Sequence, residues 1–149
     1  MNIFCRCFST KIPTWKETIP FKPNIKKCYV IKVYDGDTIT VASKLPYSNS
    51  PMYRWSVRIR GIDSPEMKSK EKSENIIAKL AQKTLSDLIL NKQVELKNIS
   101  KDKYGRLLCD VYYNKVFISD WMIKRRLAVS YLGQKKDPPE CWVSYYNNY

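Results

Sequence analysis

The stretch CYVIKVYDGDTITVAS, residues 28–43, decides the fold of this chain. Residues 28–34 are rich in β-branched and aromatic side chains, and they stop at the turn signal Asp-Gly-Asp of residues 35–37. From residue 38 onward polar and apolar side chains alternate, which is the period of a half-buried strand. The spans 28–34 and 38–43 therefore predict a β-hairpin.

Three more strands follow the hairpin. Residues 53–60 alternate strictly, so Trp55, Val57 and Ile59 share one face while polar and basic side chains take the other. Apolar residues around Val94 and Leu96 indicate a fourth strand. A glycine-containing turn then precedes a fifth strand over residues 107–113.

Apolar spacing predicts two helices, and a capping pattern predicts a third. Side chains between Ile77 and Ile89 recur every three or four positions, and a shorter run of the same kind covers about 118–127. Near the end, Asp137 resembles an N-cap residue followed by proline at the first helical position, which predicts a last short helix that carries Trp142.

This order of elements predicts an α+β fold that is mainly β, a five-stranded barrel of the OB type with flanking helices. Residues 1–25 contain three prolines and no periodicity, so we expect an extended N-terminal arm. Residues 26–134 would form the barrel domain, and residues 135–149 a short C-terminal helical tail.

The composition excludes several kinds of site. The 149 residues include 27 Lys and Arg, 14 Asp and Glu and no histidine, for a net charge of +13. A Ser-His-Asp triad, a histidine base, an imidazole zinc site and a His-ligated haem are therefore impossible. The positive charge favours polyanionic partners, with nucleic acid first and an anionic membrane surface second.

The cysteines and the first residues predict an intracellular protein. Five scattered cysteines without a Cys-x-x-Cys pair are typical of reduced thiols. The first eight residues are too short an apolar run for a secretory signal, and Arg6 interrupts them. No run approaches the ~20 apolar residues of a membrane span. We expect no signal peptide, no transmembrane segment and a monomer.

Three charged segments lie beside turn signals: Asp-Gly-Asp-Thr at 35–38, Arg-Ile-Arg-Gly-Ile-Asp-Ser-Pro-Glu at 58–66, and Asp-Lys-Tyr-Gly-Arg at 102–106. Each alone is compatible with an ordinary turn or strand end. Together they supply carboxylates suited to a hard cation, two arginines whose planar groups suit a phosphate, and a further carboxylate for proton transfer. Phosphodiester hydrolysis requires this combination of groups.

The three segments, in this order, resemble the motifs DGDT, R-x-x-x-x-D-x-P-E and DKYGR of the staphylococcal (thermonuclease) nuclease family. The resemblance covers about residues 28–131. It implies an OB-type barrel with three helices. It also implies a calcium-dependent endonuclease or related hydrolase that cleaves DNA, and also RNA, at the 5′ P–O bond to leave 3′-phosphates. Single-stranded or denatured DNA would be the expected substrate.

The resemblance assigns a role to nine residues. The calcium ligands would be Asp37, Asp63 and the main-chain carbonyl of Ser64, where the family usually has threonine. Glu66 would be the general base, or would position the attacking water. The remaining expected groups are the phosphate-binding arginines Arg58 and Arg106, and the nucleotide-binding residues Lys103, Tyr104 and Tyr131.

Two other hypotheses about the function remain open. The chain can be a catalytically weak or inactive nucleic-acid-binding module on the same barrel, although such a module would be expected to lose carboxylates or arginines that are present here. A membrane-associated basic protein is the weakest alternative, because it depends only on charge and on the Cys5 and Cys7 region. The pairs Lys26-Lys27 and Lys135-Lys136 are expected to be solvated surface.

Overall fold

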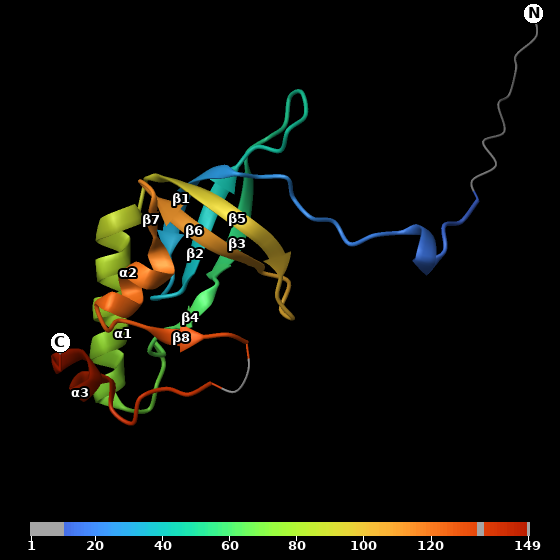
Figure 1. The fold of residues 1–149 in the computed structure, drawn as a ribbon. Helices are drawn as coiled ribbons and strands as arrows, with labels where there is room; N and C mark the ends of the chain where they lie inside the picture. The colour runs from blue at the N-terminus through green and yellow to red at the C-terminus, as the bar shows by residue number, and fades with distance from the viewer. Residues whose placement is uncertain (1–10, 134–135, 149) are drawn as a thin grey trace, which may run out of the picture.

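The structure, a computed structural model, describes residues 11–133 and 136–148. Five strands close into a barrel, as the sequence predicted (Figure 1). They run in the order β3-β2-β1-β5-β6, and a parallel pairing of β3 with β6 completes the circle. The barrel strands are β1 (Lys27–Val33), β2 (Thr38–Ser43), β3 (Tyr53–Ile59), β5 (Gln93–Lys101) and β6 (Leu107–Tyr113).

The predicted hairpin forms from β1 and β2, which pair antiparallel. Their apolar side chains alternate into the barrel, so Val30, Ile39 and Val41 are fully buried. The register shifts between Val30 and Lys32, and this irregularity lets Ile31 point outward. The alternation in sequence thus located both strands correctly.

Arg60 reinforces the closure of the barrel just beyond β3. Its Nη2 donates to the carbonyl oxygens of Asn98 at 2.6 Å and Leu108 at 2.9 Å, and to Ser100 Oγ at 2.7 Å. One guanidinium therefore ties the end of β3 to both β5 and β6.

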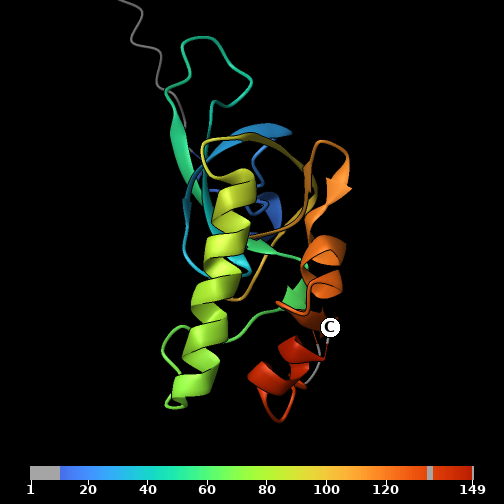
Figure 2. The ribbon, with the colours of Figure 1, turned by 90° about the vertical axis from the view of Figure 1, so that its left-hand side faces the viewer.

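Three helices gather at one side of the barrel (Figure 2). They are α1 (Lys72–Ile89), α2 (Ile118–Lys124) and α3 (Trp142–Asn147). The buried face of α1 includes Ile77, Ala81, Leu85 and Ile89, which follow the three-and-four spacing seen in the sequence. Among the described residues, no helix has both the length and the apolar character needed to cross a membrane.

The start of the last helix was predicted wrongly. It begins at Trp142 with Cys141 as N-cap, and not after Asp137. A proline disfavours helical backbone in the residue before it, so Pro139 disfavours a helix that starts at Pro138.

The sequence also missed several short elements. These are η1 (Trp15–Glu17), β4 (Gly61–Asp63), β7 (Val116–Phe117) and β8 (Val129–Tyr131). β4 and β8 pair antiparallel beside the barrel, with Gly61 opposite Tyr131. This small ribbon holds Asp63 at the end of β4, and it places the chain that follows β8 next to that carboxylate.

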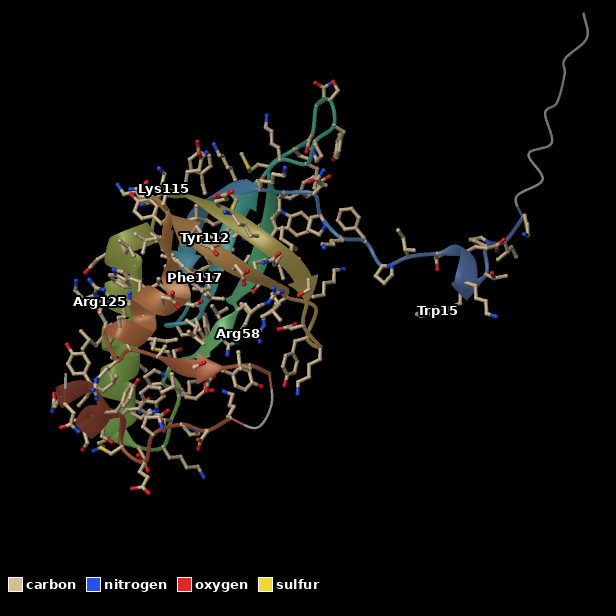
Figure 3. The ribbon with its side chains drawn as sticks, in the orientation of Figure 1. Trp15, Arg58, Tyr112, Lys115, Phe117 and Arg125 are labelled. Carbon is tan, nitrogen blue, oxygen red and sulfur yellow. The ribbon has the colours of Figure 1, made fainter. Side chains whose placement is uncertain are left out.

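The N-terminal arm extends away from the barrel, with Trp15 exposed on its single turn of 3-10 helix (Figure 3). Nearer the barrel, Phe21 stacks on Trp55 with ring centroids 6.4 Å apart. Cys5 and Cys7, on which the membrane-associated alternative depends, lie outside the described residues.

Candidate functional site

All nine residues predicted for the site line one open cavity of about 570 Å³. The cavity forms where the start of β2, the end of β3, β4 and the turn before β6 meet. Asp37, Arg58 and Asp63 form its buried end, whereas Glu66 and Tyr104 are exposed at the rim. The structure thus brings together segments that are far apart in sequence.

The turn at residues 35–38 is built to hold Asp37. Asp35 Oδ1 accepts hydrogen bonds from the amides of Asp37 at 3.0 Å and Thr38 at 2.7 Å. Burial, and then the negative charge of Asp37, raise the pKa of Asp35 to about 6. Asp37 Oδ2 in turn accepts from the amide of Ser64 at 3.0 Å. Asp37 is therefore fixed directly against the segment that carries Asp63.

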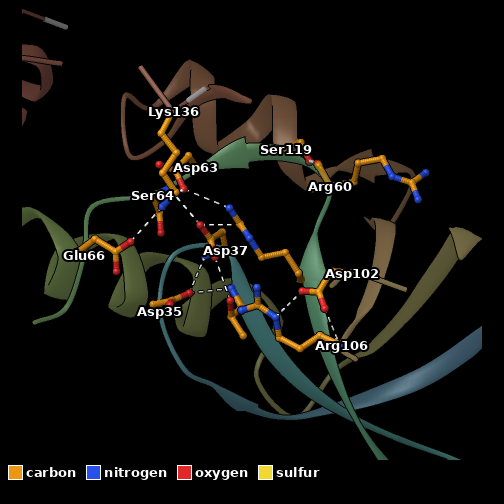
Figure 4. A network of polar contacts seen from close by, with 12 residues as sticks. Asp35, Asp37, Arg60, Asp63, Ser64, Glu66, Asp102, Arg106, Ser119 and Lys136 are labelled. Atoms are coloured by element: carbon orange, nitrogen blue, oxygen red, sulfur yellow. Dashed lines mark hydrogen bonds and ion pairs between the residues drawn. The ribbon is translucent and has the colours of Figure 1, made fainter. Parts of the chain in front are cut away.

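Arg58 joins the buried carboxylates of Asp37 and Asp63. Figure 4 labels both aspartates, which lie close together. Arg58 Nη2 donates to Asp63 Oδ1 at 3.1 Å. Its Nη1 lies 2.6 Å from Asp37 Oδ2, close enough for an ion pair although the angle is outside hydrogen-bond geometry. Each of the three side chains is at most 11% exposed. Such buried charges persist only when they are paired, so the three groups hold each other in place.

Arg106 is positioned by Asp102 in the turn before β6. Asp102 Oδ2 accepts from Arg106 Nε at 2.7 Å, and its Oδ1 accepts from the amides of Tyr104 and Arg106, each at 2.9 Å. Although partial burial opposes the effect, these hydrogen bonds lower the pKa of Asp102. Arg106 lines the cavity, and within the described part of the chain its terminal guanidinium nitrogens make no hydrogen bond.

The three predicted nucleotide-binding residues line the same cavity. Tyr104 is 72% exposed, and Lys103 Nζ lies 5.0 Å from the centroid of its ring. Tyr131 reaches the cavity from β8. An exposed aromatic ring beside cationic groups is a surface on which a nucleobase can stack.

Lys136 is exposed, as expected, since half of its side chain is accessible to solvent, but sequence reasoning missed its contacts with the site. Its Nζ lies 3.0 Å from Asp63 Oδ1 and donates to Glu66 Oε1 at 3.0 Å. Although partial burial opposes the effect, the two carboxylates raise the pKa of Lys136. No local pattern marks this residue, because the contact depends on the path of the chain after β8. Its neighbour Lys135 lies outside the described residues.

The donor set at the buried end suits a hard cation. Asp37 and Asp63 provide carboxylate oxygens, the ligand type that Ca²⁺ takes. The described residues contain no group of three or more Asp, Glu, His or Cys side chains that could hold a metal ion. A cation held by these two carboxylates would therefore need main-chain carbonyl and water ligands as well, which is common for Ca²⁺.

Comparison with known proteins gives one family. The profile of the family described as staphylococcal nuclease homologue matches residues 56–143. An uncharacterized endonuclease of Haemophilus influenzae is 40% identical over 111 residues, which cover 74% of this chain and 56% of that protein. A probable endonuclease of Schizosaccharomyces pombe is 31% identical over 127 residues, which cover 70% of this chain and 55% of that protein.

A staphylococcal-like nuclease of Arabidopsis thaliana is 31% identical over 86 residues, which cover 56% of this chain. The aligned segment is only 24% of the plant protein. This chain thus spans about half, or less, of the length of these relatives.

Proposed function

Because this chain belongs to the staphylococcal nuclease family, we propose that it hydrolyses phosphodiester bonds of DNA and also of RNA. Cleavage would occur at the 5′ P–O bond and leave 3′-phosphates. One observation carries the proposal: two carboxylates, two arginines and a further glutamate line a single cavity. Each of these groups has a distinct task in such a hydrolysis.

Calcium is the proposed cofactor, held by Asp37, Asp63 and the main-chain carbonyl of Ser64. When bound, it would neutralise charge on the phosphate and orient the attacking water. The protein prepares for it by fixing Asp37 against Ser64 and by holding both carboxylates around Arg58. Little rearrangement of the carboxylates is then needed, which favours binding.

Arg58 and Arg106 are proposed to bind the phosphate that is cleaved. A guanidinium offers several N–H groups in one plane and matches phosphate oxygens better than an ammonium does. Asp102 limits the motion of Arg106, so less side-chain entropy is lost when a phosphate binds. Charge that develops on the phosphoryl oxygens would be stabilised by these donors.

Glu66 is proposed to accept a proton from the attacking water, or to position that water. Its side chain is 66% exposed at the rim, where water has direct access. A carboxylate that reaches a water by hydrogen bonding can act as a general base without histidine. The absence of histidine from the chain is therefore compatible with this reaction.

Lys103, Tyr104 and Tyr131 are proposed to contact the nucleotide next to the cleaved bond. A single-stranded or denatured substrate fits this arrangement, because its bases are free to stack on an exposed ring. The net charge of +13 would attract the phosphate backbone from a distance.

The test is cleavage of end-labelled denatured DNA and of RNA by the purified protein, with calcium and with a chelator. We expect calcium-dependent cleavage that leaves 3′-phosphate ends, identified by their sensitivity to a 3′-phosphatase. Glu66→Gln should reduce the rate by about 100-fold or more, as expected for loss of a general base. Glu140→Gln, an exposed change outside the cavity, is the matched control.

Two results would reject the proposal in different ways. If the protein bound DNA but did not cleave it, whichever divalent cation was added, the result would favour the alternative, a nucleic-acid-binding module. Undiminished cleavage in chelator would remove calcium from the mechanism while leaving the nuclease activity itself.

A further inference from the structure

We infer that Lys136 is a resident counter-cation of the carboxylate site, that a metal ion competes with it there, and that this competition lowers the metal affinity. The inference rests on the proposed function, because it concerns the cation which that function requires. It assigns a task to a side chain outside the nine predicted residues.

The contacts of Asp63 carry the argument. Its Oδ1 accepts from Arg58 Nη2 at 3.1 Å and lies 3.0 Å from Lys136 Nζ. A carboxylate oxygen has about two acceptor positions, so both positions of Oδ1 are taken. A metal ion that binds through this oxygen must therefore remove one of the two cationic groups.

Lys136 is the group that can leave at small cost. Arg58 is only 11% exposed and also pairs with Asp37, so its removal would leave a second buried carboxylate unpaired. Lys136 is 50% exposed, and its ammonium regains water as soon as it moves away. An ion pair with that much exposure contributes little to stability. The anchored arginine should therefore stay while the lysine leaves.

The competition does not depend on which oxygen of Asp63 binds the metal. Ligation through Oδ2 alone would still place a divalent cation beside an ammonium group, and like charges repel. Either route weakens binding. Loss of an exposed ion pair and repulsion of a double charge together correspond to about a tenfold change in affinity.

The same ammonium also restrains Glu66. Glu66 Oε1 accepts from Lys136 Nζ, and its backbone amide donates to Glu74 Oε1 at 2.9 Å. Displacement of Lys136 would leave the backbone of Glu66 in place and free its carboxylate for water. Lys136 would thus be a positioning residue that keeps Glu66 occupied until the carboxylate site is filled.

The experiment measures calcium binding by isothermal titration calorimetry at low ionic strength, without nucleic acid. Lys136→Met should bind calcium about tenfold more tightly than the unsubstituted protein, and Lys136→Arg should stay within about twofold. Lys44→Met is the control, because it removes one exposed positive charge at the end of β2 remote from Asp37. It should leave the affinity within about twofold.

A second readout separates competition from a merely structural role. At a fixed calcium concentration well above both dissociation constants, tenfold tighter binding adds about 1.4 kcal/mol to the calcium-dependent stabilisation. The rise in Tm on adding calcium should therefore be larger for Lys136→Met than for Lys44→Met. If Lys136 had only a structural role, Lys136→Met would lower Tm by the same amount with and without calcium.

Several outcomes would overturn the inference. These are equal calcium affinity in Lys136→Met and Lys44→Met, weaker binding in Lys136→Met, or no binding of calcium by any variant. Because these measurements contain no nucleic acid, their failure is distinct from failure of the proposed hydrolysis, which the cleavage assay decides.

Discussion

Substitution of Gly36 by alanine tests how closely the two carboxylate-bearing segments approach each other. A Cβ at position 36 would lie 2.7 Å from Ser64 Cβ and 3.0 Å from Ala81 Cβ. Both neighbours are buried atoms next to the main chain, so neither can rotate away. The backbone at residue 36, at the segment beside Ser64 or at α1 must shift instead.

The expected cost follows from these distances. Overpacking of this kind costs about 1–3 kcal/mol of stability. Alanine also lowers the conformational entropy of the unfolded chain, which offsets about 0.4–1 kcal/mol of that cost. We expect a net loss of about 1–2 kcal/mol in the free energy of unfolding, which lowers Tm by about 2–8 °C in a chain of this size. Calcium affinity should fall as well, because the shift would separate Asp37 from Asp63.

Urea denaturation measured by circular dichroism gives the free energy, and a double-mutant cycle locates the clash. Adding Ser64→Gly to Gly36→Ala should recover about half of the loss, with a coupling energy above about 0.5 kcal/mol. Gly105→Ala is the control, because Gly105 has φ +82° and no atom within 4 Å of its added Cβ. Its cost comes from backbone strain, so Ser64→Gly should not relieve it.

A loss below about 0.5 kcal/mol for Gly36→Ala would refute this reasoning, since the segments would then separate at no cost. A full loss without any coupling to Ser64 would place the clash elsewhere, against Ala81.

Two further substitutions and one labelling experiment test the supports of the barrel and the cavity. Asp102→Asn should lower kcat/KM for cleavage about tenfold by loosening Arg106; it should cost about 1 kcal/mol of stability at pH 7. Since the pKa of Asp102 is lowered in the folded state, this stability cost should disappear as pH falls below about 4, measured by urea denaturation. Arg60→Met should destabilise the barrel by about 2 kcal/mol, seen in the same assay, because it leaves the carbonyls that Arg60 binds without that partner. Burial raises the pKa of Cys28 and Cys109 to about 12, so mass spectrometry after thiol labelling at pH 8 should find both unmodified in the native protein and modified in urea.

Most of the barrel could be predicted from local pattern. The alternation in 28–43 and 53–60 reports which side chains face the core, and strands with one buried face need that period of two. The buried face of α1 follows from the spacing of its apolar residues in the same way. Such patterns are local consequences of burial, so they are visible without coordinates.

Elements that depend on distant partners could not be predicted. β4 and β8 have three residues each and exist because they pair with each other across the fold. The start of α3 was misplaced because a capping pattern was given more weight than the effect of the second proline on the first.

The sequence by itself determined which chemical groups this protein can use. Three motifs carry the carboxylates, the arginines and Tyr104, and the absence of histidine removes the alternatives that need imidazole. Residue types are a property of the chain, so they do not depend on how it folds.

Only the tertiary structure decided how those groups neutralise one another. It placed Arg58 between Asp37 and Asp63, tied Arg106 to Asp102, and brought Lys136 from beyond β8 to Asp63 and Glu66. Electrostatic interactions depend on distance and on exclusion of water, and closure of the barrel sets both.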